Sequence, residues 1–297
     1  MQSGLLVDDL IYADDTLIVS VDEASADTYM RCIGKAGANY GLNFNWKKLE
    51  LLRERCQATT LQPDGSEIIS KDRITYLGSL LCDGSVGPEL GRRLGAARSE
   101  FDKLARIWSH STLSQDRKLR IFEACVLSKL LYALHTAWLN KQETARLDAF
   151  HVRCLRKIYG IPHSYISRVS NSSVLETAAC ERLSCILLKR QLHFLAHIAQ
   201  KPDEDPARSV MFKASSCILQ DRTYQRRRGR PRMTWISEVY KHALRIADNP
   251  ANLHNLCQKP MQSSWKRAVQ QYCSRGFSCS CAGHTVLACL WFLYQIP

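Results

Sequence analysis

The sequence has little of what extracellular or membrane proteins usually carry. Its 13 cysteines are an odd number, and none forms a Cys-x-x-Cys pair, so no disulfide framework is indicated. No basic, then apolar leader opens the chain. The apolar stretch at its end, residues 285–297, has only 13 residues, whereas a membrane span needs roughly 20. We therefore expect reduced thiols, an intracellular protein and no membrane partner.

Acidic residues are also scarce, with 28 Asp and Glu against 41 Lys and Arg, which gives a net charge of +13. Residues 1–88 hold 8 basic and 13 acidic side chains, a net of −5, and the remainder holds 33 and 15, a net of +18. With 45% apolar and 23% charged residues, the 297-residue chain can bury a core. An acidic start before a basic body suits a metal site followed by a polyanion-binding surface. A merely soluble basic protein remains the alternative.

Residue patterns predict an α+β fold, with strands near the start and helices after Pro88. Gly41 is expected as the C-cap of the first helix, and Asn140 with Glu143 resembles a capping box. We expect a hairpin turn at residues 63–67 and a turn at Asp83–Gly84. The expected strands cover residues 5–12, 16–21, 41–52 and 74–82, and the expected helices cover residues 22–40, 89–110, 114–138, 140–160 and 173–200.

Two adjacent carboxylates, Asp14 and Asp15, lie between the first two expected strands. Aspartate is a good turn residue because its side chain bonds the nearby backbone. The same pair could hold Mg²⁺, which prefers hard oxygen ligands and would relieve the repulsion between the two anions. Both interpretations are open from these residues alone.

Three motifs in order resemble the second half of a reverse transcriptase palm. They are "YADD" (residues 12–15), "GLNFNWKK" (41–48) and "YLGS" (76–79), and the closest likeness is to polymerases of non-LTR (LINE-like) retrotransposons. "RRLGAARSEFDKLARIW", "RLDAFHVRCLRKIYGI", "RVSNSSVLETAAC" and "RRRGRPRMTW" extend the likeness over about residues 4–245. It implies a partial palm at 1–87, a helical thumb at 88–160, a helical and basic region at 161–245 and a less defined tail at 246–297.

The resemblance implies an RNA-directed DNA polymerase that uses Mg²⁺ or Mn²⁺, an RNA template and a DNA primer or target. In its terms Asp14 is the main metal ligand, Asp15 is the adjunct, and Lys48 lies near the leaving group. Tyr12 would lie beneath the primer end, and the primer grip would comprise Tyr76, Leu77 and Gly78. The alternatives are that Lys48 is a solvated surface lysine and that residues 76–78 are a simple strand end with a turn.

The chain has only 13 residues before Asp14, whereas such a palm also needs an upstream carboxylate and the fingers. We therefore expect a 5′-truncated copy without polymerase activity. A different hypothesis is a domesticated, non-catalytic nucleic-acid-binding protein that uses the basic helical body. A third is a genomic relic with no function.

A basic segment, "RRRGRPR", places five arginines within seven residues: Arg226, Arg227, Arg228, Arg230 and Arg232. Arginine forks match phosphate geometry, and the Gly-Arg-Pro core resembles an AT-hook for a narrow minor groove. A nuclear localisation signal or a solvated run would have the same composition. We expect nucleic-acid contact here, and a nuclear rather than cytoplasmic location. Zinc is not expected at Cys279, Cys281, His284 and Cys289, because Cys-x-Cys is too short for the usual chelate turn.

Overall fold

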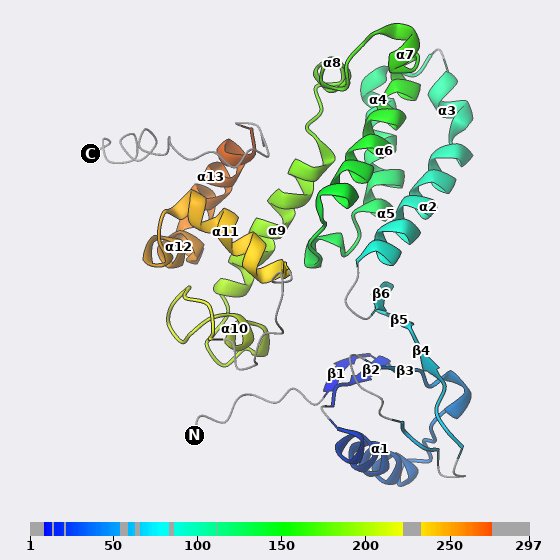
Figure 1. Ribbon diagram of the computed structural model, residues 1–297, viewed down its shortest axis with the longest axis vertical. Coiled ribbons are helices and arrows are strands. Elements are labelled where there is room, and N and C mark those ends of the chain that lie inside the picture. Colours follow the sequence, from blue (N-terminus) through cyan, green and yellow to red (C-terminus); the bar gives the residue numbers. More distant parts are fainter. Residues whose placement is uncertain are drawn as a thin grey trace.

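The computed structural model describes residues 9–13, 15–20, 22–53, 59–62, 66–82, 86–110, 112–221 and 233–274. Short strands and one helix form a β-rich part (residues 9–82), and helices form a helical body (residues 86–274). Figure 1 shows the β-rich part beneath the helical body, with β6 next to the start of α2. The expected α+β class with a mostly helical body is confirmed.

The first hairpin and the helix after it form as the sequence predicts. Strands β1 (Asp9–Tyr12) and β2 (Asp15–Ile18) pair antiparallel, and helix α1 (Glu23–Ala38) follows. The Asp22 side chain caps α1 by accepting a hydrogen bond from the Ser25 N–H at 2.7 Å. The helix ends earlier than expected, with Asn39 as its C-cap, while Gly41 has the left-handed φ of +71°.

Two expected strands of the β-rich part are wrong. Instead of one strand at 41–52, the chain forms a 3₁₀ turn, η1 (Trp46–Lys48), and then β3 (Leu51–Leu52), which pairs parallel with β4 (Ser70–Lys71). The Lys48 and Leu49 N–H groups bond the Asn45 and Trp46 carbonyls at 2.8 and 3.3 Å, so these backbone groups close a local turn instead of pairing with another strand.

The strand expected from residue 74 is instead a hairpin of β5 (Arg73–Tyr76) and β6 (Ser79–Cys82). Leu77 and Gly78 reverse the chain, both with positive φ, +47° and +72°. Two such residues produce the tight turn whose twist matches an antiparallel pair. The turn expected at Asp83–Gly84, and part of the one expected at residues 63–67, lie outside the described residues.

The helical body follows the predicted order of helices with four interruptions. A break at Leu104 divides the first helix, and a π-helical turn lies within the second. The second helix also ends at Leu130 rather than near residue 138, because Ala133 is left-handed, and a left-handed Ala179 divides the fourth. The elements are α2 (Gly87–Lys103), α3 (Ala105–Ser109), α4 (Gln115–Ile121), η2 (Phe122–Leu127), α5 (Ser128–Leu130), η3 (Leu134–Thr136), α6 (Lys141–Tyr159), α7 (Ser164–Ser167), α8 (Asn171–Thr177), α9 (Leu183–Ala199), α10 (Pro206–Met211), α11 (Trp235–Ala247), α12 (Pro250–Cys257), η4 (Lys259–Met261) and α13 (Gln262–Ser274).

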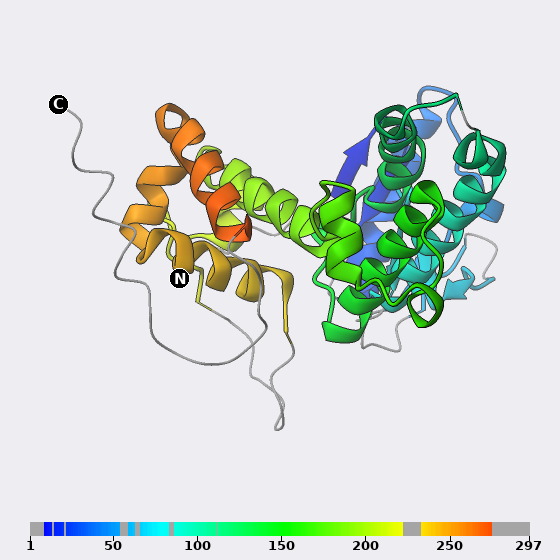
Figure 2. The same ribbon diagram turned by 90° about the horizontal axis from the view of Figure 1, so that it is seen from above.

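Two hydrophobic cores stabilise the helical body, and α9 takes part in both. The buried side chains of α9 up to Leu187 belong to the first core, which also contains side chains of α2, α4 and α6. Those from Leu188 onward belong to the second core, together with side chains of α11, α12 and α13. Figure 2 shows α9 running from one group of helices to the other. The predicted domain boundaries at residues 160 and 245 stay predictions.

The β-rich part has almost no core of its own. Among its described residues, Ile68 is the only buried hydrophobic side chain, and α1 buries none. Its attachment to the helical body therefore depends on particular contacts rather than on a shared core. No described helix combines the length and the apolar character needed to cross a membrane.

Candidate nucleic-acid interface

The predicted site residues fall into two groups. Asp14 and the five arginines of residues 226–232 lie outside the described residues. Asp15 and Tyr12 are described, and they pair with each other in register at the tip of the β1–β2 hairpin. Ala13 has a φ of +53° at this tip, as a tight reversal requires, and the Tyr12 side chain is exposed.

The structure joins one palm-like motif to the strand that leads into another. The hydroxyl of Tyr76 donates a hydrogen bond to the Leu10 carbonyl at 2.9 Å, across 66 positions of sequence. The carboxylate hairpin and the turn after Tyr76 are therefore neighbours. Lys48, by contrast, is exposed on η1, and no bond among the described residues joins its side chain to either motif. Its predicted role stays a prediction.

The turn after Tyr76 is fastened to the helical body by three charged residues of α2: Glu89, Arg92 and Arg93, together called the α2 clasp. The Gly78 carbonyl accepts hydrogen bonds from Arg92 Nη2 at 2.7 Å and Arg93 Nη2 at 2.5 Å. Gly78 suits this position because its φ of +72° strains any residue with a Cβ. The backbone of the turn thus meets two guanidinium groups directly.

Helical spacing explains how the clasp is built. Positions three and four residues apart lie on one face of a helix, so the Glu89 carboxylate reaches Arg92 Nε at 2.8 Å and Arg93 Nε at 2.6 Å. Glu89 also accepts the Leu80 N–H from β6 at 3.2 Å. Burial alone would raise the Glu89 pKa, but the two guanidinium groups outweigh burial and lower that pKa below its usual value.

Tyr132, in the turn after α5, completes the contact. Its hydroxyl donates a hydrogen bond to the Leu77 carbonyl at 3.0 Å, and the Arg93 guanidinium lies 4.6 Å from its ring centroid. A Cβ at Gly78 would lie 3.5 Å from the ring. Neither Tyr132 nor the clasp is predicted from the sequence, in which the only signal for the clasp is the Glu-x-x-Arg-Arg spacing.

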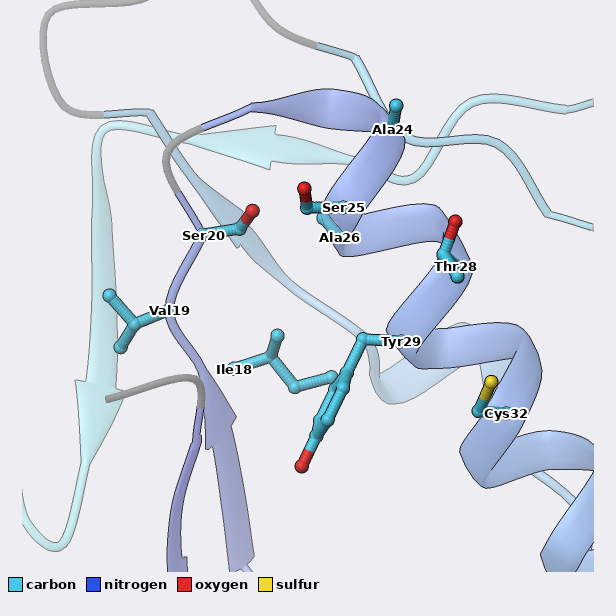
Figure 3. Close-up of a pocket in the computed structure, with 9 residues that line it drawn as sticks. All are labelled: Ile18, Val19, Ser20, Ala24, Ser25, Ala26, Thr28, Tyr29 and Cys32. Atoms are coloured by element: carbon cyan, nitrogen blue, oxygen red, sulfur yellow. The ribbon is translucent and has the colours of Figure 1, made fainter. Parts of the chain in front are cut away.

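A cavity of about 460 Å³ lies elsewhere in the β-rich part, between β2 and α1 (Figure 3). Ile18, Val19, Tyr29 and Cys32 line it together with small side chains. The described lining holds no carboxylate, imidazole or lysine. Tyr29 and Cys32 are the titratable groups of the described lining, and the Tyr29 hydroxyl donates a hydrogen bond to Asp9 at 2.6 Å.

The tip of the β1–β2 hairpin is where the sequence predicts a metal site. Asp15 supplies a hard oxygen donor there, of the type that Mg²⁺ prefers. Within the described part of the chain, no group of three or more His, Cys, Asp or Glu side chains could hold a metal ion. Strands β3 to β6 carry no acidic residue. The predicted Mg²⁺ site at Asp14 and Asp15 stays a prediction.

Comparison with known proteins gives one informative relationship. A Caenorhabditis elegans protein, described in its name only as "transposon-derived", is 23% identical over 211 residues, which cover 68% of this chain and 75% of the worm protein. The chain is similar to a transposon-derived protein. No profile of a known family matches the chain, and no solved structure matches it. The relationship points to a transposable-element origin and leaves the activity to be proposed.

Proposed function

We propose that the chain is the C-terminal part of a non-LTR retrotransposon reverse transcriptase, comprising part of the palm, the thumb and a basic region that binds nucleic acid. The observation that carries this proposal is the 2.9 Å bond between Tyr76 and Leu10. It makes the carboxylate hairpin and the Tyr-Leu-Gly turn neighbours, as a polymerase that grips a primer beside its metal ions requires. The similarity to a transposon-derived protein supports the same origin.

In this proposal the side chains have separate roles. Asp14 and Asp15 would hold Mg²⁺ or Mn²⁺, which when bound stabilises charge at the oxygens that attack and leave phosphorus. Tyr12 and the turn at residues 76–78 would contact the primer, and the arginines of residues 226–232 would contact phosphates. Polymerisation also needs a carboxylate from another strand, and the described strands β3 to β6 supply none.

We therefore expect the 297-residue chain, tested alone, to bind nucleic acid without extending a primer. Purified protein should incorporate no deoxynucleotide on an RNA template with a recessed DNA primer, in Mg²⁺ or in Mn²⁺. Incorporation that disappears in the Asp14→Ala variant would mean that the chain is an active polymerase. Incorporation that persists in Asp14→Ala would indicate a contaminating enzyme.

Binding is tested by the salt dependence of the dissociation constant. Each neutralised phosphate of duplex DNA contributes a slope of roughly 0.9 in log K against log salt. Replacing the five arginines of residues 226–232 by alanine should flatten the slope by about 3 to 4 units, with one arginine idle. Replacing the same five by lysine is the matched control, because it keeps the charge and should keep most of the slope. An unchanged slope in the alanine variant would show that the segment does not bind phosphate.

The alternative function, a non-catalytic nucleic-acid-binding protein, is favoured by the net charge of +18 on residues 89–297. The two functions differ in the preferred ligand. A polymerase-derived surface should bind a recessed RNA–DNA primer-template more tightly than a blunt duplex of equal length. Equal affinity for both would favour the non-catalytic protein. If the Gly-Arg-Pro segment works as an AT-hook, A·T-rich duplexes should be preferred, and the lysine variant should lose that preference.

A further inference from the structure

The α2 clasp and Tyr132 leave part of their surface unused, and this surface adjoins the proposed primer-binding turn. The Arg92 side chain is 40% exposed. Its Nε and Nη2 bind Glu89 and Gly78, whereas Nη1 donates to no acceptor among the described residues. One end of this guanidinium is therefore anchored, and the other is available for a ligand. An anchored arginine loses less side-chain freedom on binding than a free one.

The charge of this cluster is positive. Glu89 neutralises one of the two guanidinium groups, and Arg93 is buried beneath the turn. The positive charge that remains is presented by Arg92, the more exposed of the two. Such a fixed fork matches the geometry of a phosphate better than that of a neutral ligand.

Tyr132 offers a flat surface next to this charge. The residue is 50% exposed although its hydroxyl is bonded to Leu77. Arg93 and Gly78 lie against its ring, so contacts within the protein hold the ring in one orientation. A fixed, half-exposed aromatic ring beside a cation is the arrangement that binds a base or a sugar of a nucleic-acid strand.

We propose that Tyr132 and Arg92 form a nucleic-acid contact on the helical body, in which the Tyr132 ring stacks on a base or sugar and Arg92 Nη1 binds the adjacent phosphate. This inference rests on the proposed function and extends its primer-binding turn onto the helical body. The clasp keeps the two parts of the surface in register, because the Gly78 carbonyl is bonded to the same arginine that would meet the phosphate.

Paired variants separate nucleic-acid contact from a structural role. Tyr132→Phe removes the bond to Leu77 and keeps the ring, whereas Tyr132→Leu removes the ring. Arg92→Gln removes the charge, and Arg98→Gln is its matched control, because Arg98 is an exposed arginine of the same helix. The probe is a recessed RNA–DNA primer-template with a fluorescent label, titrated with full-length protein at several salt concentrations. Thermal unfolding of each variant reports whether it is folded.

The expected results differ between the variants. Tyr132→Leu should weaken binding at least fivefold, and Tyr132→Phe should remain within twofold of the original protein. Arg92→Gln should lower the salt slope by about 0.9, the value for one lost phosphate contact, and Arg98→Gln should leave the slope unchanged. If Tyr132→Leu does not fold, the Arg92 and Arg98 pair and Tyr132→Phe still decide the matter.

Four results would overturn the inference. Equal loss in Tyr132→Phe and Tyr132→Leu would make the hydroxyl bond, and hence a structural role, responsible. Equal salt slopes for Arg92→Gln and Arg98→Gln would show that Arg92 makes no specific contact with a phosphate. A third result is that none of these variants changes the affinity, whereas the alanine variant of residues 226–232 lowers it. This result would refute the Tyr132–Arg92 contact and would leave the proposed function standing. An original protein that binds no nucleic acid would refute both.

Discussion

Glu89 is expected to be a principal stabiliser of the contact between the β-rich part and the helical body. Only 7% of Glu89 and 9% of Arg93 are exposed, and the carboxylate accepts hydrogen bonds from two guanidinium groups and the Leu80 N–H. In Glu89→Gln, an amide of similar shape loses the charge and turns an N–H₂ group toward donors. Removing one partner of a buried ion pair costs about 3 to 5 kcal/mol. Because Arg92 is partly solvated, we expect about 2 to 3 kcal/mol here.

The matched control is Glu100→Gln on the same helix, where the carboxylate meets Lys129 at 2.6 Å near the surface. Urea unfolding followed by circular dichroism should show a clear decrease in the free energy of unfolding for Glu89→Gln. The decrease for Glu100→Gln should be much smaller. Hydrogen exchange at β5 and β6 should rise only in Glu89→Gln. The Glu89 pKa is lowered, so its stabilisation is present above the usual value and is lost as pH falls through the folded-state pKa. Equal destabilisation by the two variants would refute the reasoning.

Three further predictions concern other parts of the fold. Burial lowers the pKa of His151 from 6.5 to about 4, and nearby Asp148 offsets this only in part. The unfolded state therefore binds the proton first, stability should fall by about 3 kcal/mol as pH decreases from 6.5 to 4, and His151→Leu should lose that part of the pH dependence in urea titrations. Asn140→Ala should lower the free energy of unfolding by about 1 kcal/mol in urea titrations, because α6 loses its N-cap. Asn140→Ser should keep most of that stability, because serine also caps helices. Amides of residues 9–80 should exchange faster than those of helices α2 to α9, and uniform protection would contradict this, because the β-rich part buries so little apolar surface.

Helix ends could be predicted where the capping residue has the usual chemistry. Asn140 and Glu143 form the expected capping box, and Ser114 caps α4. Gly160 ends α6 in the left-handed conformation, while the Ile161 N–H bonds the Arg156 carbonyl at 2.8 Å. These side chains interact with backbone groups within a few positions of themselves, so the local sequence suffices to place them.

The break between α8 and α9 has the same backbone geometry as the end of α6, but its sequence gives no sign of it. The Cys180 N–H bonds the Leu175 carbonyl, and the Ala179 N–H bonds the Glu176 carbonyl. This is the motif that usually has glycine in the left-handed position, and here Ala179 occupies it with φ +48°. An alanine continues a helix in any reading of local preference. Tertiary packing decides instead, since Val174 and Leu183 on either side of the break are both fully buried in the first core.

The candidate interface shows the same limit at longer range. Tyr12, Tyr76 and Gly78 could be selected because "YADD" and "YLGS" resemble motifs of a reverse transcriptase palm. Glu89, Arg92 and Arg93 have the spacing of an ordinary solvated ion-pair face on a helix, and nothing near them in sequence indicates that a turn carbonyl lies above them. Tyr132 lies 54 positions beyond Gly78, in an apolar run where a core role is the simpler interpretation. These residues come together only when the β5–β6 turn meets α2, and the proposed nucleic-acid contact depends on that meeting.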